Sequence, residues 1–402
     1  MKPRLLYLTH RVPHPPDKGD RIRNFHVLRE LAKVARVTLV SLADEPASAE
    51  SAATLKGLCE TVEIVPSGGR RRWLRAGRSL LSGRSLSEGL FREPALDAAL
   101  ARLAASQEWD ASLVSASSLT PYQQRHGLPA KPRFVDLVDV DSQKWFDYAD
   151  AASGPKHALY SLEGHRVRKL ERQIAGWAAA AFLVSPAECA VFDGFTHAGA
   201  GTVAMNGVDL DSFRPQHDVP TRPICAFVGA LDYFPNIDAA LWFATDIWPT
   251  IRARKPEAEF HVIGRKPTPA VLRLNAIEGV RILADVPDVR PHLAGAALAV
   301  CPIRVARGLQ NKVLEAMAMA KATLAAPAAI RAIRAEVGKD LLVPTTETEW
   351  VSNVCDLLDD PARRSGLGTA ARRFVETHHH WDRCLQPLVS AILAAMPSRV
   401  PA

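Results

Sequence analysis

The sequence has no long hydrophobic run and no close pair of cysteines. None of its apolar segments reaches the roughly 20 residues that a membrane-spanning helix needs. The apolar run at the N-terminus is too short for a signal peptide and is broken by His10 and Arg11. The six cysteines are scattered among mostly apolar neighbours, which argues against a disulfide framework and a zinc site. We therefore expect a protein that is made and kept in the reducing cytoplasm.

Acidic residues are in the minority. There are 50 Lys and Arg against 43 Asp and Glu, which gives a net charge of +7. This excess indicates anionic partners, but it does not distinguish nucleotides from anionic lipid or nucleic acid. Hydrophobic residues make up 48% of the chain, which excludes disorder for most of it. A length of 402 residues exceeds what one core normally supports, so we expect two domains.

The first half alternates apolar runs with helical patterns. Residues 4–9 (RLLYLT) predict a buried strand, which a Pro-rich loop, Gly19 and an amphipathic helix follow. This order is typical of a doubly wound α/β domain, in which ligands bind at the carboxyl ends of the strands. A full GxGxxG fingerprint is missing, so Gly19 either faces a ligand or is a plain turn glycine. We expect this domain to cover residues 1–205.

A basic insertion interrupts this alternation at residues 69–91. It carries six arginines and a single acid beside Trp73 and several leucines. Such a mixture suits the surface of an anionic membrane, where we expect Arg71, Trp73 and Arg75 to contact lipid or an acceptor. The alternative is a basic surface helix that packs on its own domain.

The second half repeats the βαβ pattern. Residues 224–229 (ICAFVG) predict a strand that ends at Gly229. Before it, an Asn-Gly turn and a loop-like HDVPTRP segment predict a domain boundary near residue 218. We expect a hinge over residues 206–221 and a second domain over residues 222–377.

The most informative stretch is residues 301–327, CPIRVARGLQNKVLEAMAMAKATLAAP. It predicts a strand end, a loop with Gly308, a helix from Lys312 and another strand. A loop that leads into a helix start leaves backbone N–H groups free and favours a phosphate. Lys312 and Glu315 share one helical face, so the pair could hold an anion and a hydroxyl-bearing ring. The alternative is an ordinary helix with a solvated Lys–Glu pair.

These residues also carry a resemblance to a known family. Pro302, Arg304, Gly308 and Lys312, followed by LEAMA, resemble the signature of family 4 glycosyltransferases of the GT-B fold. NGVD at residues 206–209 resembles the element at the domain hinge of these enzymes. The strings PPDKGDRIRNFH, FVGALDYFPN and VARGLQNKVLEAMA look closest to bacterial sugar transferases of exopolysaccharide and PEP-CTERM systems.

The resemblance implies a fold and an activity. The fold would be two Rossmann-like doubly wound domains that face a central cleft, with a final helix at 378–402 packed back on the first domain. The activity would be the transfer of a sugar, with retention and without a metal or other cofactor, from a UDP- or GDP-sugar. A saccharide or lipid-linked acceptor would receive it during the synthesis of a cell-surface polysaccharide.

The resemblance also implies residue roles, with Glu315 as the ligand of the donor ribose. The donor-binding residues would be Gly19, Gly229, Arg304, Gly308, Lys312 and Glu315. The catalytic residues would be Lys312 and Glu315, and we add Asp141 because it follows a predicted strand at the edge of the sheet where ligands bind. Asp139 and Asp141 form a DxD pattern, which holds a metal in the GT-A class of glycosyltransferases. We expect no metal here, because a GT-A enzyme would have a single domain and we expect two.

Several positions depart from the family pattern. Arg307 stands where many members carry a further glutamate, Ala230 where arginine follows VG, and Pro235–Asn236 where Lys-Gly is usual. We therefore expect fewer charged side chains around the donor diphosphate than in most members of the family. Two alternatives follow: a catalytically degenerate GT-B protein that acts as a partner subunit, and a nucleotide-sugar epimerase. The expected location is the cytoplasm, with peripheral binding to the inner face of the cell membrane and no nucleic-acid partner.

Overall fold

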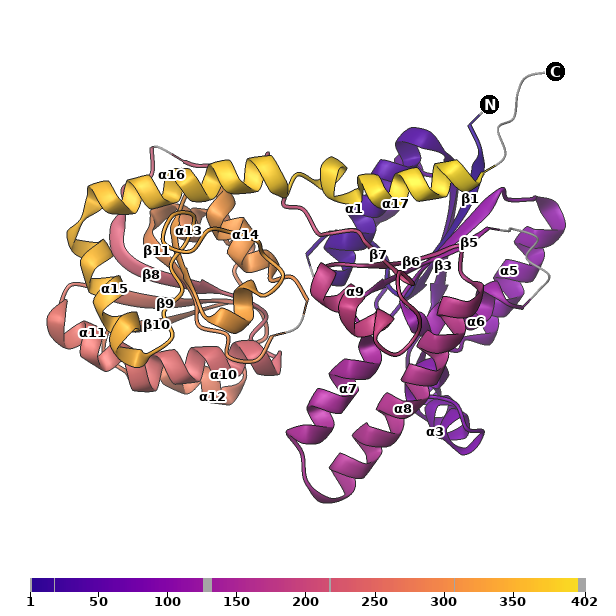
Figure 1. Ribbon diagram of the computed structural model, residues 1–402, viewed down its shortest axis with the longest axis horizontal. Coiled ribbons are helices and arrows are strands. Elements are labelled where there is room, and N and C mark those ends of the chain that lie inside the picture. Colours follow the sequence, from indigo (N-terminus) through magenta and orange to yellow (C-terminus); the bar gives the residue numbers. More distant parts are fainter. Residues whose placement is uncertain (1, 18, 126–131, 217, 307, 397–402) are drawn as a thin grey trace. The chain divides into compact units, whose positions relative to one another are not determined.

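The computed structural model describes residues 2–17, 19–125, 132–216, 218–306 and 308–396, and the chain divides into two compact units. Unit 1 holds the residues up to Met205 together with the chain from Leu385, and unit 2 holds Asn206–Cys384. Each unit is built on a parallel β-sheet with helices in its crossover connections (Figure 1). The expected α/β class with two doubly wound domains is confirmed.

The sheet of unit 1 has seven strands in the order β3-β2-β1-β4-β5-β6-β7. Leu5, Leu6, Tyr7 and Leu8 of the central strand β1 are fully buried, because helices cover both faces of such a sheet. The strands of unit 1 are β1 (Arg4–Thr9), β2 (Arg36–Ala43), β3 (Thr61–Pro66), β4 (Ala111–Ser115), β5 (Arg133–Val138), β6 (Ala180–Leu183) and β7 (Gly201–Val203). Its helices are α1 (Gly19–Val34), α2 (Ala49–Leu58), α3 (Arg71–Leu81), α4 (Leu86–Phe91), α5 (Pro94–Ser106), α6 (Thr120–Gln123), α7 (Asp141–Asp150), α8 (Gly154–Trp177) and α9 (Pro186–Asp193).

The sheet of unit 2 has five strands in the order β10-β9-β8-β11-β12. All six residues of β11 are buried, which explains its unbroken apolar sequence. The strands are β8 (Arg222–Val228), β9 (Glu259–Gly264), β10 (Val280–Ala284), β11 (Ala296–Cys301) and β12 (Ala322–Ala325). The helices are α10 (Phe234–Trp242), α11 (Trp248–Arg254), α12 (Pro269–Leu272), α13 (Arg290–Gly295), α14 (Asn311–Ala318), α15 (Glu347–Asp359) and α16 (Pro361–His378). The last helix, α17 (Trp381–Ala395), begins in unit 2 and belongs to unit 1 from Leu385.

Both sheets reverse their order beside the first strand of the unit. The chain adds β2 and β3 on one side of β1 and then continues with β4 on its other side; β8 has the same relation to β9 and β11. The carboxyl ends of β1 and β4, and of β8 and β11, are therefore topological switch points. Ligands of open parallel sheets bind at such points.

A buried ion pair joins the first helix of unit 1 to its sheet. Arg23 of α1 donates from Nε and Nη2 to the two carboxylate oxygens of Asp136 on β5, both at 2.8 Å. It also donates from Nη1 to the carbonyl oxygen of Ala204 at 2.9 Å. Burial opposes the charge of Arg23, but the pairing with Asp136 outweighs it and raises the pKa of the guanidinium. Three segments of unit 1 thus converge on one side chain.

Asp136→Ala should lower the free energy of unfolding by about 3–5 kcal/mol, because it leaves a buried guanidinium without its counterion. Urea unfolding followed by circular dichroism measures this loss. The matched control is Arg102→Ala, which removes an exposed pair with Glu63 and should cost less than about 1 kcal/mol. Equal losses in the two variants would contradict the importance assigned to the buried pair.

Candidate functional site

Two glycines allow the strand ends of unit 2 to approach closely. A Cβ at Gly264, the last residue of β9, would lie 1.7 Å from the carbonyl oxygen of Gly229. A Cβ at Gly229 would lie 2.8 Å from the Asn236 amide nitrogen. Neither position can carry a side chain without displacing its neighbour. Gly229, which the sequence assigned to the donor site, is thus needed for packing at the switch point.

The loop after β11 leads into α14 and brings Lys312 to this switch point. Gly308 has a φ of +62°, a backbone conformation that glycine adopts without strain. The ammonium of Lys312 donates to Asn236 Oδ1 at 3.0 Å and to Gln310 Oε1 at 3.2 Å. Burial lowers the pKa of Lys312, while the neighbouring Cys301 and Glu315 act in the opposite direction. The site therefore holds a partly desolvated cation between two neutral amides.

Glu315 lies one turn further along α14. Burial raises its pKa to about 7, and the nearby Lys312 only partly offsets this rise. Its carboxylate has no hydrogen bond or ion pair with any residue in the described ranges. A half-buried carboxylate with open acceptor positions can receive hydrogen bonds from the hydroxyl groups of a ligand.

Arg304, which was expected to supply charge to the donor, is held by α10. Its guanidinium contacts both carboxylate oxygens of Asp238, at 2.6 and 3.1 Å, and lies 5.0 Å from the ring centre of Trp242. The carboxylate of Asp238 balances the charge of Arg304, whereas the hydrogen-bond acceptors of Lys312 in the described ranges are neutral. The role of Arg304 stays a prediction, and Arg307 lies outside the described residues.

In unit 1, Gly19 is the first residue of α1. A Cβ there would meet nothing within 4 Å, so packing does not require the glycine and its donor role stays a prediction. The next residue, Asp20, lies within 3.1 Å of His10 and accepts a hydrogen bond from Arg11 at 2.8 Å. Burial would raise the pKa of Asp20, but these two partners hold it well below its usual range.

The two aspartates of the DxD pattern have different surroundings. Asp141 begins α7 and accepts a hydrogen bond from the Ser117 hydroxyl at 3.0 Å. Asp139 has a buried Oδ1 without a partner, and burial and Glu188 raise its pKa to about 7. Asp139 is thus a candidate functional residue. The sequence showed it as part of the DxD pattern but gave no reason to prefer it over Asp141. Nowhere in the described ranges do three His, Cys, Asp or Glu side chains gather as a metal site requires.

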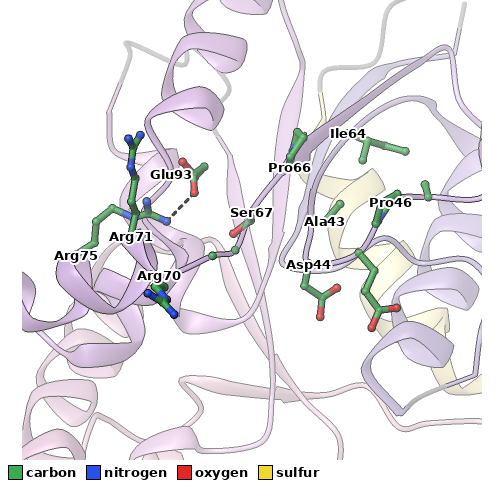
Figure 2. Close-up of a pocket in the computed structure, with 14 residues that line it drawn as sticks. Ala43, Asp44, Pro46, Ile64, Pro66, Ser67, Arg70, Arg71, Arg75 and Glu93 are labelled. Atoms are coloured by element: carbon green, nitrogen blue, oxygen red, sulfur yellow. Dashed lines mark hydrogen bonds and ion pairs between the residues drawn. The ribbon is translucent and has the colours of Figure 1, made fainter.

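The basic insertion forms α3 and α4, and its start borders an open cavity of about 600 Å³ (Figure 2). The carboxyl ends of β2 and β3 line one side of the cavity, and Arg70, Arg71 and Arg75 line another. Arg75 donates to Glu93 at 2.6 Å. Trp73 is 62% exposed and lies outside this lining. No helix in the part of the chain that the structure describes is long and apolar enough to cross a membrane.

Glu315→Gln should make the protein more stable at pH 8 and change it little at pH 5. The raised pKa means that folding favours the protonated carboxyl, so stability falls as pH rises from the unfolded value of 4.5 to the folded value of about 7. Thermal unfolding at both pH values measures this difference. Glu257→Gln, at an exposed position of unit 2, serves as the control. An equal gain at both pH values would contradict the assignment.

Comparisons with known proteins come from both sequence and structure. Residues 222–360 match the family described as Glycosyl transferases group 1. No curated protein sequence matches the chain. The structure is similar to HepE from Anabaena in complex with UDP and glucose, with 14% identity, a TM-score of 0.68 and coverage of 98% of this chain and 100% of that chain.

Two further structures extend the likeness. Sucrose-phosphate synthase from Thermosynechococcus elongatus shares 16% identity, with a TM-score of 0.72 and coverage of 98% of this chain and 100% of that chain. WaaG, a glycosyltransferase involved in lipopolysaccharide biosynthesis, shares 13% identity, with a TM-score of 0.66 and coverage of 97% and 99%. The chain therefore has the GT-B fold of glycosyltransferases, and within unit 2 its residues 222–360 match the group 1 family.

Proposed function

We propose that the chain transfers a sugar from a nucleotide diphosphosugar to a saccharide or lipid-linked acceptor, with retention, in the synthesis of a cell-surface polysaccharide. The observation that carries the proposal is the Lys312 ammonium at the β8–β11 switch point, between two neutral amides. This point lies within the segment that matches group 1 glycosyl transferases. UDP is the preferred nucleotide of the proposal, because HepE was crystallised with UDP.

In this mechanism the bond between the sugar and the diphosphate breaks as a new bond to an acceptor oxygen forms. The nucleoside diphosphate leaves with a negative charge that develops on its departing phosphate oxygen, and this oxygen takes up the proton that the acceptor hydroxyl loses. The ammonium of Lys312 and the N-terminus of α14 stabilise that charge electrostatically. Glu315 accepts hydrogen bonds from the ribose hydroxyls. Gly308 lets the backbone approach the diphosphate closely, and Gly229 supports the donor site by leaving room for the Asn236 amide that meets Lys312.

Asp141 or Asp139 would serve the acceptor in unit 1. Both lie at the carboxyl end of β5 or just beyond it, on the edge of the sheet where ligands bind. Oδ1 of Asp139 is buried and has no hydrogen-bond partner in the described ranges, whereas Asp141 already accepts a hydrogen bond from Ser117. Whichever carboxylate contacts the acceptor would accept a hydrogen bond from the acceptor hydroxyl. This bond would hold the hydroxyl oxygen in position to attack the sugar.

The purified chain should transfer sugar from one member of a panel of UDP- and GDP-sugars to a saccharide or lipid-linked acceptor. Glu315→Ala should raise the KM for the donor at least tenfold, because one or two hydrogen bonds to a charged group are lost, and Glu257→Ala should leave it unchanged. Magnetic resonance of the product reports whether the anomeric configuration is retained.

Two outcomes would replace the proposal. If nucleotide binds and no sugar is transferred, the chain is a binding subunit with a degenerate site. If the donor sugar changes its configuration without any acceptor, the chain is an epimerase. Absence of a thermal shift with every nucleoside diphosphate and nucleotide sugar would overturn the donor site itself, since a ligand that binds the folded state must stabilise it.

We propose further that α3 binds the anionic surface of the membrane that holds a lipid-linked acceptor. Trp73, Leu74 and Leu81 are 62%, 70% and 89% exposed, and the exposed Arg71 and Arg78 lie on the same helix. Apolar side chains that enter the lipid boundary, beside cations that pair with lipid phosphates, favour an anionic bilayer. Arg71 and Arg75 also line the adjacent cavity, which offers space for the polar head of an acceptor.

The membrane face would be rigidly attached to unit 1. Arg166 of α8 donates to the carbonyl oxygens of Leu80 and Arg84, at 2.5 and 2.7 Å. The buried carboxylate of Glu163, also on α8, accepts hydrogen bonds from the backbone N–H groups of Leu86 and Ser87. Both ends of the turn between α3 and α4 are therefore held on one long helix.

Co-sedimentation with vesicles tests the membrane surface. The chain should bind vesicles that contain anionic phosphatidylglycerol, bind pure phosphatidylcholine weakly, and lose affinity as salt concentration rises. Arg71→Ala with Arg78→Ala should lower the affinity roughly tenfold or more, since each cation contributes on the order of 1 kcal/mol. Leu272→Ser, at an exposed position of unit 2, is the control. Binding that is independent of lipid charge would contradict this surface.

A further inference from the structure

Asn236 connects the two loops that meet at the β8–β11 switch point. It lies in the first turn of α10 and is only 3% exposed. Its side-chain Nδ2 donates to the carbonyl oxygen of Ala230 at 2.8 Å. Its Oδ1 accepts from the Lys312 ammonium at 3.0 Å. One buried amide therefore ties the loop after β8 to the first turn of α14.

The chemistry of these partners fixes the orientation of the amide. An ammonium only donates hydrogen bonds and a backbone carbonyl only accepts them, so the amide oxygen must face Lys312 and the nitrogen must face Ala230. Gly229 leaves room for the amide in this orientation, because a Cβ at Gly229 would lie 2.8 Å from Asn236 Nδ2. The end of β8 is built around the Asn236 side chain.

The amide holds the ammonium without cancelling its charge. The hydrogen-bond acceptors of Lys312 in the described ranges are the neutral oxygens of Asn236 and Gln310, and an ammonium has three N–H donors. Arg304 provides the contrast, since Asp238 neutralises its guanidinium. A partly desolvated ammonium whose hydrogen-bond acceptors are neutral interacts strongly with an incoming anion, although the nearby Glu315 also acts on its charge.

We propose that Asn236 is a positioning residue that aims the Lys312 ammonium, through a hydrogen bond from it to a neutral amide, at the diphosphate of the nucleotide. This inference rests on the proposed function. It also gives a meaning to the Pro235–Asn236 departure in the sequence. An amide that orients Lys312 stands where many members of the resembling family carry a cation.

The inference predicts how nucleotide affinity depends on pH. Burial holds the pKa of Lys312 below its usual 10.5, although Cys301 on β11 and Glu315 on α14 act in the opposite direction. The ammonium is therefore charged below that lowered value and loses its proton as pH rises through it. The affinity for UDP should fall over the same range. A carboxylate in place of the amide would pair with the ammonium, raise the pKa of Lys312 and move this fall to higher pH.

Calorimetric titration of the full chain with UDP and with uridine, between pH 7 and 10, tests the inference. At pH 7, Asn236→Ala should weaken UDP binding roughly tenfold or more, because a hydrogen bond to a charged group is lost. Asn236→Asp should weaken it further, since a negative charge faces the diphosphate, and should move the loss of affinity to higher pH. Uridine has no phosphate, so its affinity should be the same in all variants.

A second variant keeps the test decisive if changes at the buried position disturb folding. Gln310→Glu places a carboxylate at the other, less buried acceptor of Lys312 and should shift the pH dependence in the same direction. Asn275→Ala, at an exposed asparagine of unit 2, should change neither affinity nor pH dependence.

Two results would overturn the inference. One is an unchanged UDP affinity and pH profile in Asn236→Asp and Gln310→Glu. The other is an equal loss of UDP and uridine binding, which would assign Asn236 a merely structural role. Failure of the proposed function is seen in the unaltered chain instead: it would bind neither UDP nor GDP at any pH, or would bind nucleotide without transferring sugar.

Discussion

Every strand in both sheets pairs in parallel with its neighbours, and this constraint decides where the candidate chemistry lies. Parallel strands bring all their carboxyl ends to one edge, and the return of the chain past its first strand leaves two loops side by side there. In unit 2 these loops carry Gly229 and Lys312, whose positions 83 residues apart in the sequence would otherwise have no reason to meet. The helices and the buried apolar strands serve to hold that edge in place.

The strand ends at this edge can approach closely because Gly229 and Gly264 have no side chain. Gly264 and Gly229 touch through their backbones, and Asn236 fills the space that a Cβ at Gly229 would take. The buried amide then faces Lys312. In unit 1 the equivalent constraint is electrostatic, since Arg23 is surrounded by Asp136 and the carbonyl of Ala204.

Local sequence patterns predicted the strands, the parallel α/β class and the helix of Lys312 and Glu315 because these features depend on apolar runs and on spacing over a few residues. The expected helix start at Lys312 differs from α14 by one residue. The pairing of Arg304 with Asp238 was not predictable, since it joins residues 66 apart. The hydrogen bond between Asn236 and Lys312 was not predictable for the same reason. In the sequence Asn236 looked like a missing cation, whereas in the structure it is a partner of Lys312. The lack of a hydrogen-bond partner for the buried Oδ1 of Asp139 in the described ranges was not predictable either. It depends on burial, which the DxD pattern does not encode.

The attachment of the basic insertion to α8 has a mechanical consequence. Arg166 and Glu163 hold the turn between α3 and α4 at four backbone groups, and α8 with its antiparallel partner α7 extends from the sheet of unit 1 (Figure 1). A force applied to the exposed face of α3 therefore passes to α8 and is not absorbed by a slack loop. The same 24-residue helix is bound to the start of α7, because Glu171 accepts hydrogen bonds from the backbone N–H and the hydroxyl of Ser142. The basic insertion and the residue after Asp141 are thus anchored on one helix.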